Sequence, residues 1–176
     1  DVYKRQDLVE EAADLPSAPS DGVEAANAIC QDHADQANLG GEWIAWVGAG
    51  GTSGEHNMAI DSGLPLDVQF ANTGGELVAR DYARLVSRDS SGSYLNNDII
   101  KDENGIAVRS RDVWTGLRAS GISDNDSNQC NNWEGGGEAL IGLTGAGSRA
   151  WTDGYSSGAQ TCNNKQARLY CFQTIN

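Results

Sequence analysis

Near its end the chain reads TCNNKQARLYCFQ, residues 161–173. The stretch holds two of the four cysteines, Cys162 and Cys171, around a run that alternates as a β-strand does. Its two faces carry Ala167, Leu169 and Cys171 on one side and Arg168, Tyr170 and Phe172 on the other. The sequence therefore predicts a final strand that holds a cysteine, and the partner of that cysteine decides the fold.

The cysteines are predicted to form disulfides. Four cysteines can pair in three ways, and metal binding is the competing use of cysteine. The sequence contains no C-x-x-C, and its two histidines, His33 and His56, lie far from the cysteine-rich end. This spacing favours disulfides over zinc. Because disulfides indicate an oxidising compartment, we expect an extracellular, periplasmic or cell-surface location.

A helix is predicted around Cys30. Asp21 is the expected N-cap, Glu24 follows three residues later as in a capping box, and Gly40 is the expected stop beyond the C-terminus. One helical face carries Ala26, Ile29, Cys30, His33, Ala34 and Ala37. This face would lie close to whatever it covers, and we expect His33 to be packed in the core.

The helix favours one cysteine pairing. A Cys30–Cys171 bond would fasten the helix to the final strand, and closing so long a loop would stabilise the fold by on the order of 4–5 kcal/mol. Cys130 would then pair with Cys162 across two loop-rich stretches. Periodicity also permits a Cys162–Cys171 bond, so the alternative stays open at this point.

Charge excludes several classes of partner. The chain has 25 acidic and 12 basic residues, a formal net charge of −13. Such a surface repels nucleic acid, anionic lipid and heparin-like polyanions. No apolar run is long enough to cross a membrane. The 22 glycines, with frequent Asn, Ser and Asp, favour turns and long loops.

The chain divides into three segments. Residues 1–6, DVYKRQ, resemble a translated sequencing adaptor, so we expect the natural start to be missing. Residues 7–20 are acidic, contain two prolines and are expected to be a tether or the tail of a missing upstream segment. Residues 21–176 are predicted to form one domain.

Short strands are predicted to follow the helix. GEWIAWVGAG, residues 41–50, is apolar on both faces and predicts a strand covered on two sides. Residues 63–78 predict a strand and a turn at Gly74-Gly75, leading to YARLV; residues 97–117 predict a hairpin with Asn104-Gly105 at its turn; residues 132–154 predict a loop, a strand, a turn and another strand. One early helix followed by short strands indicates the α+β class.

The order of these motifs resembles a known family. The chain presents the helix with Cys30, LGGEWIAWV, LPL with GELVARDY, DENGIAV, VWTG, QCNNW, a glycine-rich hairpin with AWTDG, and a closing C…RLYC. Over residues 22–173 this order resembles the endostatin-like branch of the C-type-lectin-like fold. It is most similar to bacterial members, domains of unknown function in predicted surface proteins and lipoproteins. The resemblance implies nested disulfides Cys30–Cys171 and Cys130–Cys162, a mostly antiparallel twisted sheet, and binding or adhesion without catalysis.

The chain departs from the family at its ligand sites. It lacks the N-terminal zinc-binding histidines and the arginine patch of animal endostatins, and the E-P-N, Q-P-D and W-N-D motifs of calcium-dependent lectins. No zinc, heparin or sugar residue is therefore carried over.

Calcium is the one cofactor considered. Asp124, Asp126 and Asn128 stand at alternate positions, and their oxygens are of the type that binds Ca²⁺. An EF-hand would need glycine and glutamate where Gln129 and Gly135 stand, so a solvated turn is the competing interpretation. We expect no other cofactor.

Enzyme motifs fail on inspection. WVGAGGTSG places Ser53 where a dinucleotide loop needs its third glycine, and no lysine completes a P-loop. Ser53, His56 and Asp61 could be imagined as a hydrolytic set, but three groups in one loop are poorly preorganised. We expect no catalysis.

Most tryptophans are predicted to be core. Trp46, Trp114, Trp133 and Trp151 accompany strand signals, whereas Trp43, beside Glu42, is ambiguous. The predicted ligand-binding residues are Tyr155, Asp153 and Asp126. They belong to a loop surface, residues 116–158, which a Cys130–Cys162 bond would hold.

The expected function is ligand binding or adhesion, with a protein or glycan as partner. The acidic surface favours a basic protein over a polyanion. The alternatives are a passive structural domain of a larger surface protein and a hydrolase that uses the His56 loop.

Overall fold

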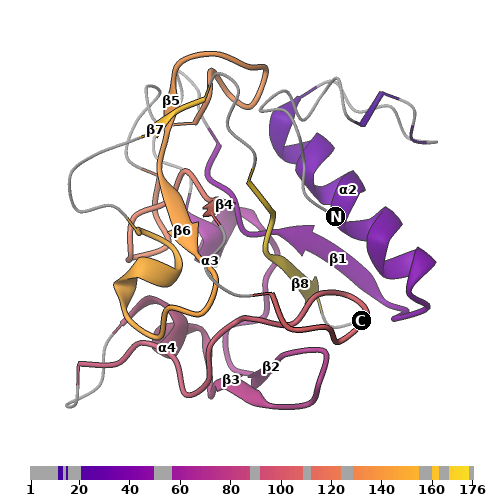
Figure 1. Cartoon of the computed structure of the whole chain (residues 1–176), viewed down its shortest axis with the longest axis vertical. Helices are drawn as coiled ribbons and strands as arrows, with labels where there is room; N and C mark the ends of the chain where they lie inside the picture. Colours follow the sequence, from indigo (N-terminus) through magenta and orange to yellow (C-terminus); the bar gives the residue numbers. More distant parts are fainter. Residues whose placement is uncertain are drawn as a thin grey trace.

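The structure is a computed structural model that describes residues 12–13, 15, 21–49, 57–87, 92–108, 112–123, 129–154, 160–162 and 167–174. Its elements are α2 (Gly22–Gln36), β1 (Glu42–Ala45), α3 (Met58–Asp61), β2 (Phe70–Ala71), β3 (Leu77–Ala79), α4 (Tyr82–Val86), β4 (Asp112–Trp114), β5 (Glu138–Ala139), β6 (Ile141–Leu143), η1 (Arg149–Trp151), β7 (Gln160–Thr161) and β8 (Cys171–Thr174). The strands form two-stranded antiparallel ladders, β1–β8, β2–β3, β4–β6 and β5–β7 (Figure 1). The predicted α+β class is confirmed.

Helix α2 begins where the sequence predicts and ends two residues earlier. The Asp21 carboxylate accepts hydrogen bonds from the backbone N–H groups of Val23 and Glu24, as an N-cap does. At the other end Asn38 adopts φ 56°, and the Leu39 N–H bonds to the Ala34 carbonyl. The prediction that Gly40 stops the helix is therefore wrong, because asparagine also tolerates the left-handed conformation that a helix terminus needs.

The β1–β8 ladder lies at the centre of the domain, and α2 lies along the outer edge of β1 (Figure 1). Antiparallel pairing leaves alternate N–H groups of an edge strand unbonded. Two helix side chains accept them: Gln31 Oε1 bonds to the Trp43 N–H, and Asn27 Oδ1 bonds to the Ala45 N–H. The helix therefore closes this sheet edge through side-chain amides.

Two hydrophobic cores lie on opposite faces of the β1–β8 ladder. Ala45 and Val47 face the core beneath α2, whereas Ile44 and Trp46 face the core that contains Phe172. The predicted strand with two covered faces is confirmed. The four tryptophans predicted to be core are fully buried: Trp46, Trp114, Trp133 and Trp151. The Trp46 and Trp151 ring centroids are 5.0 Å apart within the second core.

The turns and short elements around this ladder agree in part with those predicted from the sequence. Asn104-Gly105 lies at a tight turn, flanked by a bridge between Lys101 and Ala107, as predicted. The predicted strand and the turn at Gly74-Gly75 are part of the β2–β3 hairpin, and YARLV that follows it is helix α4. The strand expected near the end of residues 132–154 is instead the 3₁₀ turn η1. A Cβ at Gly142 of β6 would stand 2.0 Å from the Trp151 carbonyl oxygen, so glycine lets η1 pack directly on β6.

Both predicted disulfides are present. Cys30 of α2 is bonded to Cys171 of β8, and Cys130 is bonded to Cys162, with Cα–Cα distances of 5.5 and 5.7 Å. No cysteine is free. The alternative Cys162–Cys171 bond is thereby excluded, and the nested arrangement ties α2 to the end of the domain.

The segment before α2 is described at three positions. Ala12 is fully buried against the core beneath α2, and Leu15 packs on the same core. The six residues resembling an adaptor lie outside the described residues. None of the described helices has the length and apolar character needed to cross a bilayer.

Candidate functional site

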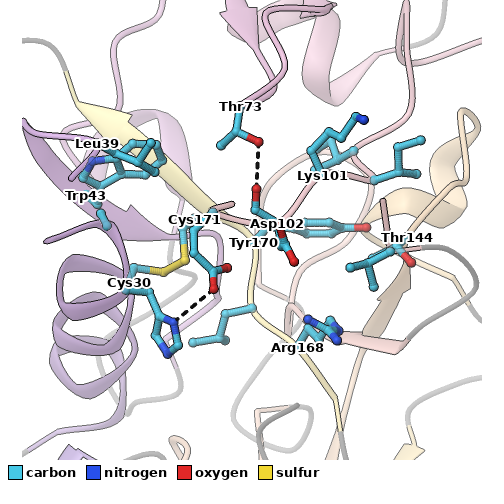
Figure 2. Close-up of a pocket in the computed structure, with 17 residues that line it drawn as sticks. Cys30, Leu39, Trp43, Thr73, Lys101, Asp102, Thr144, Arg168, Tyr170 and Cys171 are labelled. Atoms are coloured by element: carbon cyan, nitrogen blue, oxygen red, sulfur yellow. Dashed lines mark hydrogen bonds and ion pairs between the residues drawn. A yellow bond between two sulfur atoms is a disulfide. The ribbon is translucent and has the colours of Figure 1, made fainter. Parts of the chain in front are cut away.

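A pocket of about 120 Å³ lies beside the Cys30–Cys171 disulfide (Figure 2). Three segments far apart in the sequence build it. Helix α2 contributes Cys30, His33 and Ala34, the final segment contributes residues 168–171, and the hairpin at 99–108 contributes residues 99–103 and Val108. Leu39, Trp43, Thr73 and Thr144 complete the lining.

The hairpin at 99–108 is held by specific bonds. The Asp102 carboxylate accepts from the N–H groups of Asn104 and Ile106, which fixes the turn. Thr73 Oγ1 donates to the Asp102 carbonyl oxygen at 2.7 Å. His33 Nδ1 lies 3.6 Å from Glu103 Oε1, so the same hairpin is joined to α2 (Figure 2). These contacts hold the hairpin as one wall of the pocket.

His33 is a pocket residue. Its side chain keeps 20% of its surface exposed and faces Glu103 across the pocket edge. The prediction of a core histidine is wrong because α2 buries mainly its small residues, Ala25, Ala26 and Ala34 among them, while His33 lies at the border of the buried stripe.

The pocket has an apolar end and a polar end. Leu39 and Trp43 lie together at one end, and Lys101, Thr144 and Arg168 lie at the other (Figure 2). The ring of Tyr170 runs between the two ends, with its hydroxyl turned toward Thr144 (Figure 2). The arrangement suits a ligand group with one apolar and one polar side.

Two buried polar atoms at the polar end have no hydrogen-bond partner within the described ranges. They are Tyr170 Oη and Arg168 Nε. Tyr170 is only 4% exposed, and burial together with the negative charge of Asp98 raises the pKa of its hydroxyl. The hydroxyl therefore stays protonated across the neutral range. Unpaired buried groups of this kind are uncommon in folded proteins, where most find partners.

Of the residues predicted for ligand binding, only Asp153 is described, and it is not among the residues that line the pocket. Tyr155 and Asp126, and with them the calcium candidates Asp124 and Asn128, lie outside the described residues. Asp153 is described and is 8% exposed; its carboxylate accepts from Arg149 Nη2 at 2.7 Å. This ion pair occupies the Asp153 carboxylate within the fold.

Of the three residues considered as a hydrolytic set, the structure describes only Asp61. Ser53 and His56 lie outside the described residues, and the Asp61 carboxylate accepts from the Asn57 N–H at the start of α3. Across the parts of the chain that are described, no three or more His, Cys, Asp or Glu side chains gather as metal ligands would.

Sequence reasoning missed the pocket. The segments that line the pocket are far apart in sequence and meet only in the folded domain. The turn at Asn104-Gly105 predicts a hairpin, but it does not predict which segments the hairpin contacts. One signal was present: Arg168 shares a strand face with Tyr170 and Phe172. A charged side chain on an otherwise apolar strand face is costly unless a partner or solvent meets it.

Comparison with known proteins gives no assignment. No known protein family matches the chain, and no curated protein is found to be similar to it.

Proposed function

We propose that this domain is a recognition module without catalysis, which binds its ligand in the pocket beside the Cys30–Cys171 disulfide. The pocket itself is the observation that supports the proposal most strongly. It joins an apolar end to a polar end, and a disulfide fixes one of its walls. A preformed site loses little conformational freedom on binding.

The size of the pocket indicates the size of the bound group. A cavity of about 150 Å³ accommodates benzene. A pocket of about 120 Å³ therefore suits one side chain or a similar small group. In a larger partner that group would act as an anchor residue.

The titratable groups around the pocket favour ligand binding over catalysis. The Asp102 carboxylate is bonded to two backbone N–H groups, and Glu103 faces His33. Tyr170, with its raised pKa, is a poor general base near neutral pH.

We infer the fold family and the compartment from the same framework. Two nested disulfides and a helix packed on the ladder of the last strand agree with the endostatin-like branch of the C-type-lectin-like fold. Disulfides persist mainly in oxidising compartments, which favours a role outside the cytoplasm or at the cell surface. The net charge of −13 favours a partner with a basic surface.

A pocket-filling substitution tests the proposal. Leu39→Trp would fill the apolar end, whereas Leu66→Trp makes the same change at a side chain that is 42% exposed and outside the pocket. Wild type and both variants, matched in melting temperature, would be applied to arrays of glycans and extracellular proteins. We expect a wild-type signal that Leu39→Trp loses and Leu66→Trp keeps.

Two results would oppose the proposal. Binding that survives Leu39→Trp would place recognition elsewhere on the domain. Silence of the wild type across both arrays would favour a passive structural domain.

A further inference from the structure

We propose that the outer edge of β8 binds an extended peptide of a partner protein by strand pairing. One aliphatic side chain of that peptide fills the adjoining pocket, and basic residues lie at its ends. This inference rests on the proposed function and names the partner chemistry of the same site. Its starting point is a row of backbone groups along β8 that no other described part of the chain meets.

The register of the β1–β8 ladder shows which backbone groups of β8 are unpaired. The N–H groups of Trp43 and Ala45 in β1 point to α2 and away from β8. Their partners across the ladder are Gln173 and Cys171. In an antiparallel ladder such residues form non-hydrogen-bonded pairs, whose backbone groups point to the outer edges on both sides. The N–H and C=O groups of Cys171 and Gln173 therefore face away from β1.

This outer edge of β8 is open within the described ranges. No described residue on that side forms a hydrogen bond with the backbone of Cys171 or Gln173, and the hairpin at 99–108 lines the pocket without bonding to β8. Gln173 is exposed and Cys171 is partly exposed. Natural proteins protect such edges with lysine, proline or a covering element, because an open edge pairs readily with another chain. β8 has the sequence CFQT, with no charged residue and no proline.

The pocket lies beside this edge and would select one side chain. In antiparallel pairing, a peptide residue opposite Cys171 bonds to it through both N–H and C=O and directs its side chain to the same face of the sheet. That face carries the pocket, because Trp43, Leu169 and Cys171 pack on the core beneath α2 and also line the pocket (Figure 2). A space of about 120 Å³ suits one aliphatic side chain. Main-chain bonds would supply affinity, and the pocket would supply specificity.

Charge favours a basic peptide over a second copy of this chain. The formal net charge is −13, so two copies repel each other, whereas a basic segment is attracted. Lys101 and Arg168 line the pocket together with Asp102 and Glu103, so the charge of the pocket itself is close to balanced. We therefore place an uncharged residue at the pocket and basic residues at the ends of the peptide.

The free protein tests whether the edge is open. In amide hydrogen exchange followed by NMR, Phe172 is the control within the same strand, because its N–H faces β1. We expect the N–H groups of Cys171 and Gln173 to exchange at least ~10-fold faster than that of Phe172. Equal protection of all three would show that another element already covers the edge, and it would overturn the proposal.

A designed peptide tests the pairing. The probe is acetyl-Lys-Val-Leu-Val-Lys-amide, whose central leucine would enter the pocket. At about 1 mM it should slow exchange at Cys171 and Gln173 and leave Phe172 unchanged. N-methylation of the leucine removes an N–H that faces β8 and should weaken binding at least ~10-fold. N-methylation of the valine after it removes an N–H that faces away from β8, so it should change binding little.

Changes at the pocket and at the charged ends test the rest of the assignment. Glycine in place of the central leucine should weaken binding several-fold, and so should Leu39→Trp in the protein. Leu66→Trp, at an exposed side chain outside the pocket, should not. Glutamate in place of both lysines should also weaken binding. The two N-methylated peptides need no variant, so their comparison remains decisive if Leu39→Trp folds poorly.

Three results would overturn the peptide assignment. They are equal binding of the two N-methylated peptides, no change in exchange at Cys171 and Gln173 with the probe, and a dimer of the free protein in sedimentation with both N–H groups protected. The dimer would assign the edge to a second copy. If array binding still depends on Leu39 in any of these cases, the proposed function stands. If Leu39→Trp also leaves array binding intact, both fail.

Discussion

Cys30 and Cys171 are 141 residues apart in sequence, and a disulfide brings their Cα atoms to 5.5 Å. The bond joins the first long helix to the last strand and forms part of the pocket wall. The second bond, Cys130–Cys162, spans 32 residues inside the first loop. The two bonds therefore constrain the unfolded chain to different degrees.

Removing the disulfide that closes the longer loop should cost more stability, although the cost rises only with the logarithm of loop length. From loop-closure entropy we expect Cys30→Ala with Cys171→Ala to cost about 5 kcal/mol and Cys130→Ala with Cys162→Ala to cost about 4 kcal/mol, as upper figures. Urea unfolding without reductant measures both. A negligible cost for the Cys30–Cys171 pair would show that the helix is held without its bond.

The amide of Gln31 should matter more than that of Gln36. Gln31 accepts the Trp43 N–H of β1, whereas Gln36 only donates to Asp32 on the exposed helix surface. Gln31→Ala leaves a strand N–H unpaired and should cost about 1–3 kcal/mol. Gln36→Ala, the matched change on the same helix, should stay within about 0.5 kcal/mol. Equal losses in urea unfolding would show that the sheet edge gains nothing from the helix amide.

Stability should fall as pH rises above 10. Burial raises the pKa of Tyr82 to about 12, against a weaker lowering from the Ala59 backbone, and burial also raises the pKa of Tyr170. Below pH 10 both tyrosines are protonated in the folded and unfolded states. Above pH 10 the unfolded chain loses these protons first, so each group removes about 1.4 kcal/mol of stability per pH unit.

Tyr82→Phe isolates one of these groups. The Tyr82 hydroxyl is buried and makes no hydrogen bond of ordinary geometry with a described residue, apart from the weak influence of the Ala59 backbone on its pKa, so its removal should cost little at pH 7. Between pH 10 and 12 the variant should gain on wild type by about 1.4 kcal/mol per pH unit in denaturant unfolding. Parallel stability curves for the two proteins would contradict the raised pKa.

The sequence predicts local features of this fold better than its site. Asp21 caps α2 through contacts within three residues, and the alternation around Trp46 describes a strand with two covered faces. Both depend on neighbours along the chain. The end of α2 was misplaced because Asn38 and Gly40 are both compatible with a left-handed backbone, and φ is positive at both.

The pocket could not be predicted because its walls meet only through tertiary contacts. His33 and Glu103 are 70 residues apart, and nothing local to either residue indicates the other. The disulfide pairing was predictable for a different reason. The helix face that carries Cys30 favoured a bond to the final strand and left Cys162–Cys171 open, and the motif order of a resembling family implied the pairing that the structure shows.

The central claim is that a Cys30–Cys171 bond builds the wall of a binding pocket, and a non-reducing tryptic map tests that bond most directly. Trypsin cuts after Lys165 and Arg168, so the four cysteines fall in separate peptides, residues 6–80, 119–149, 150–165 and 169–176. We predict that mass spectrometry finds 6–80 linked to 169–176 and 119–149 linked to 150–165. A link between 150–165 and 169–176, or four free thiols, would contradict the account.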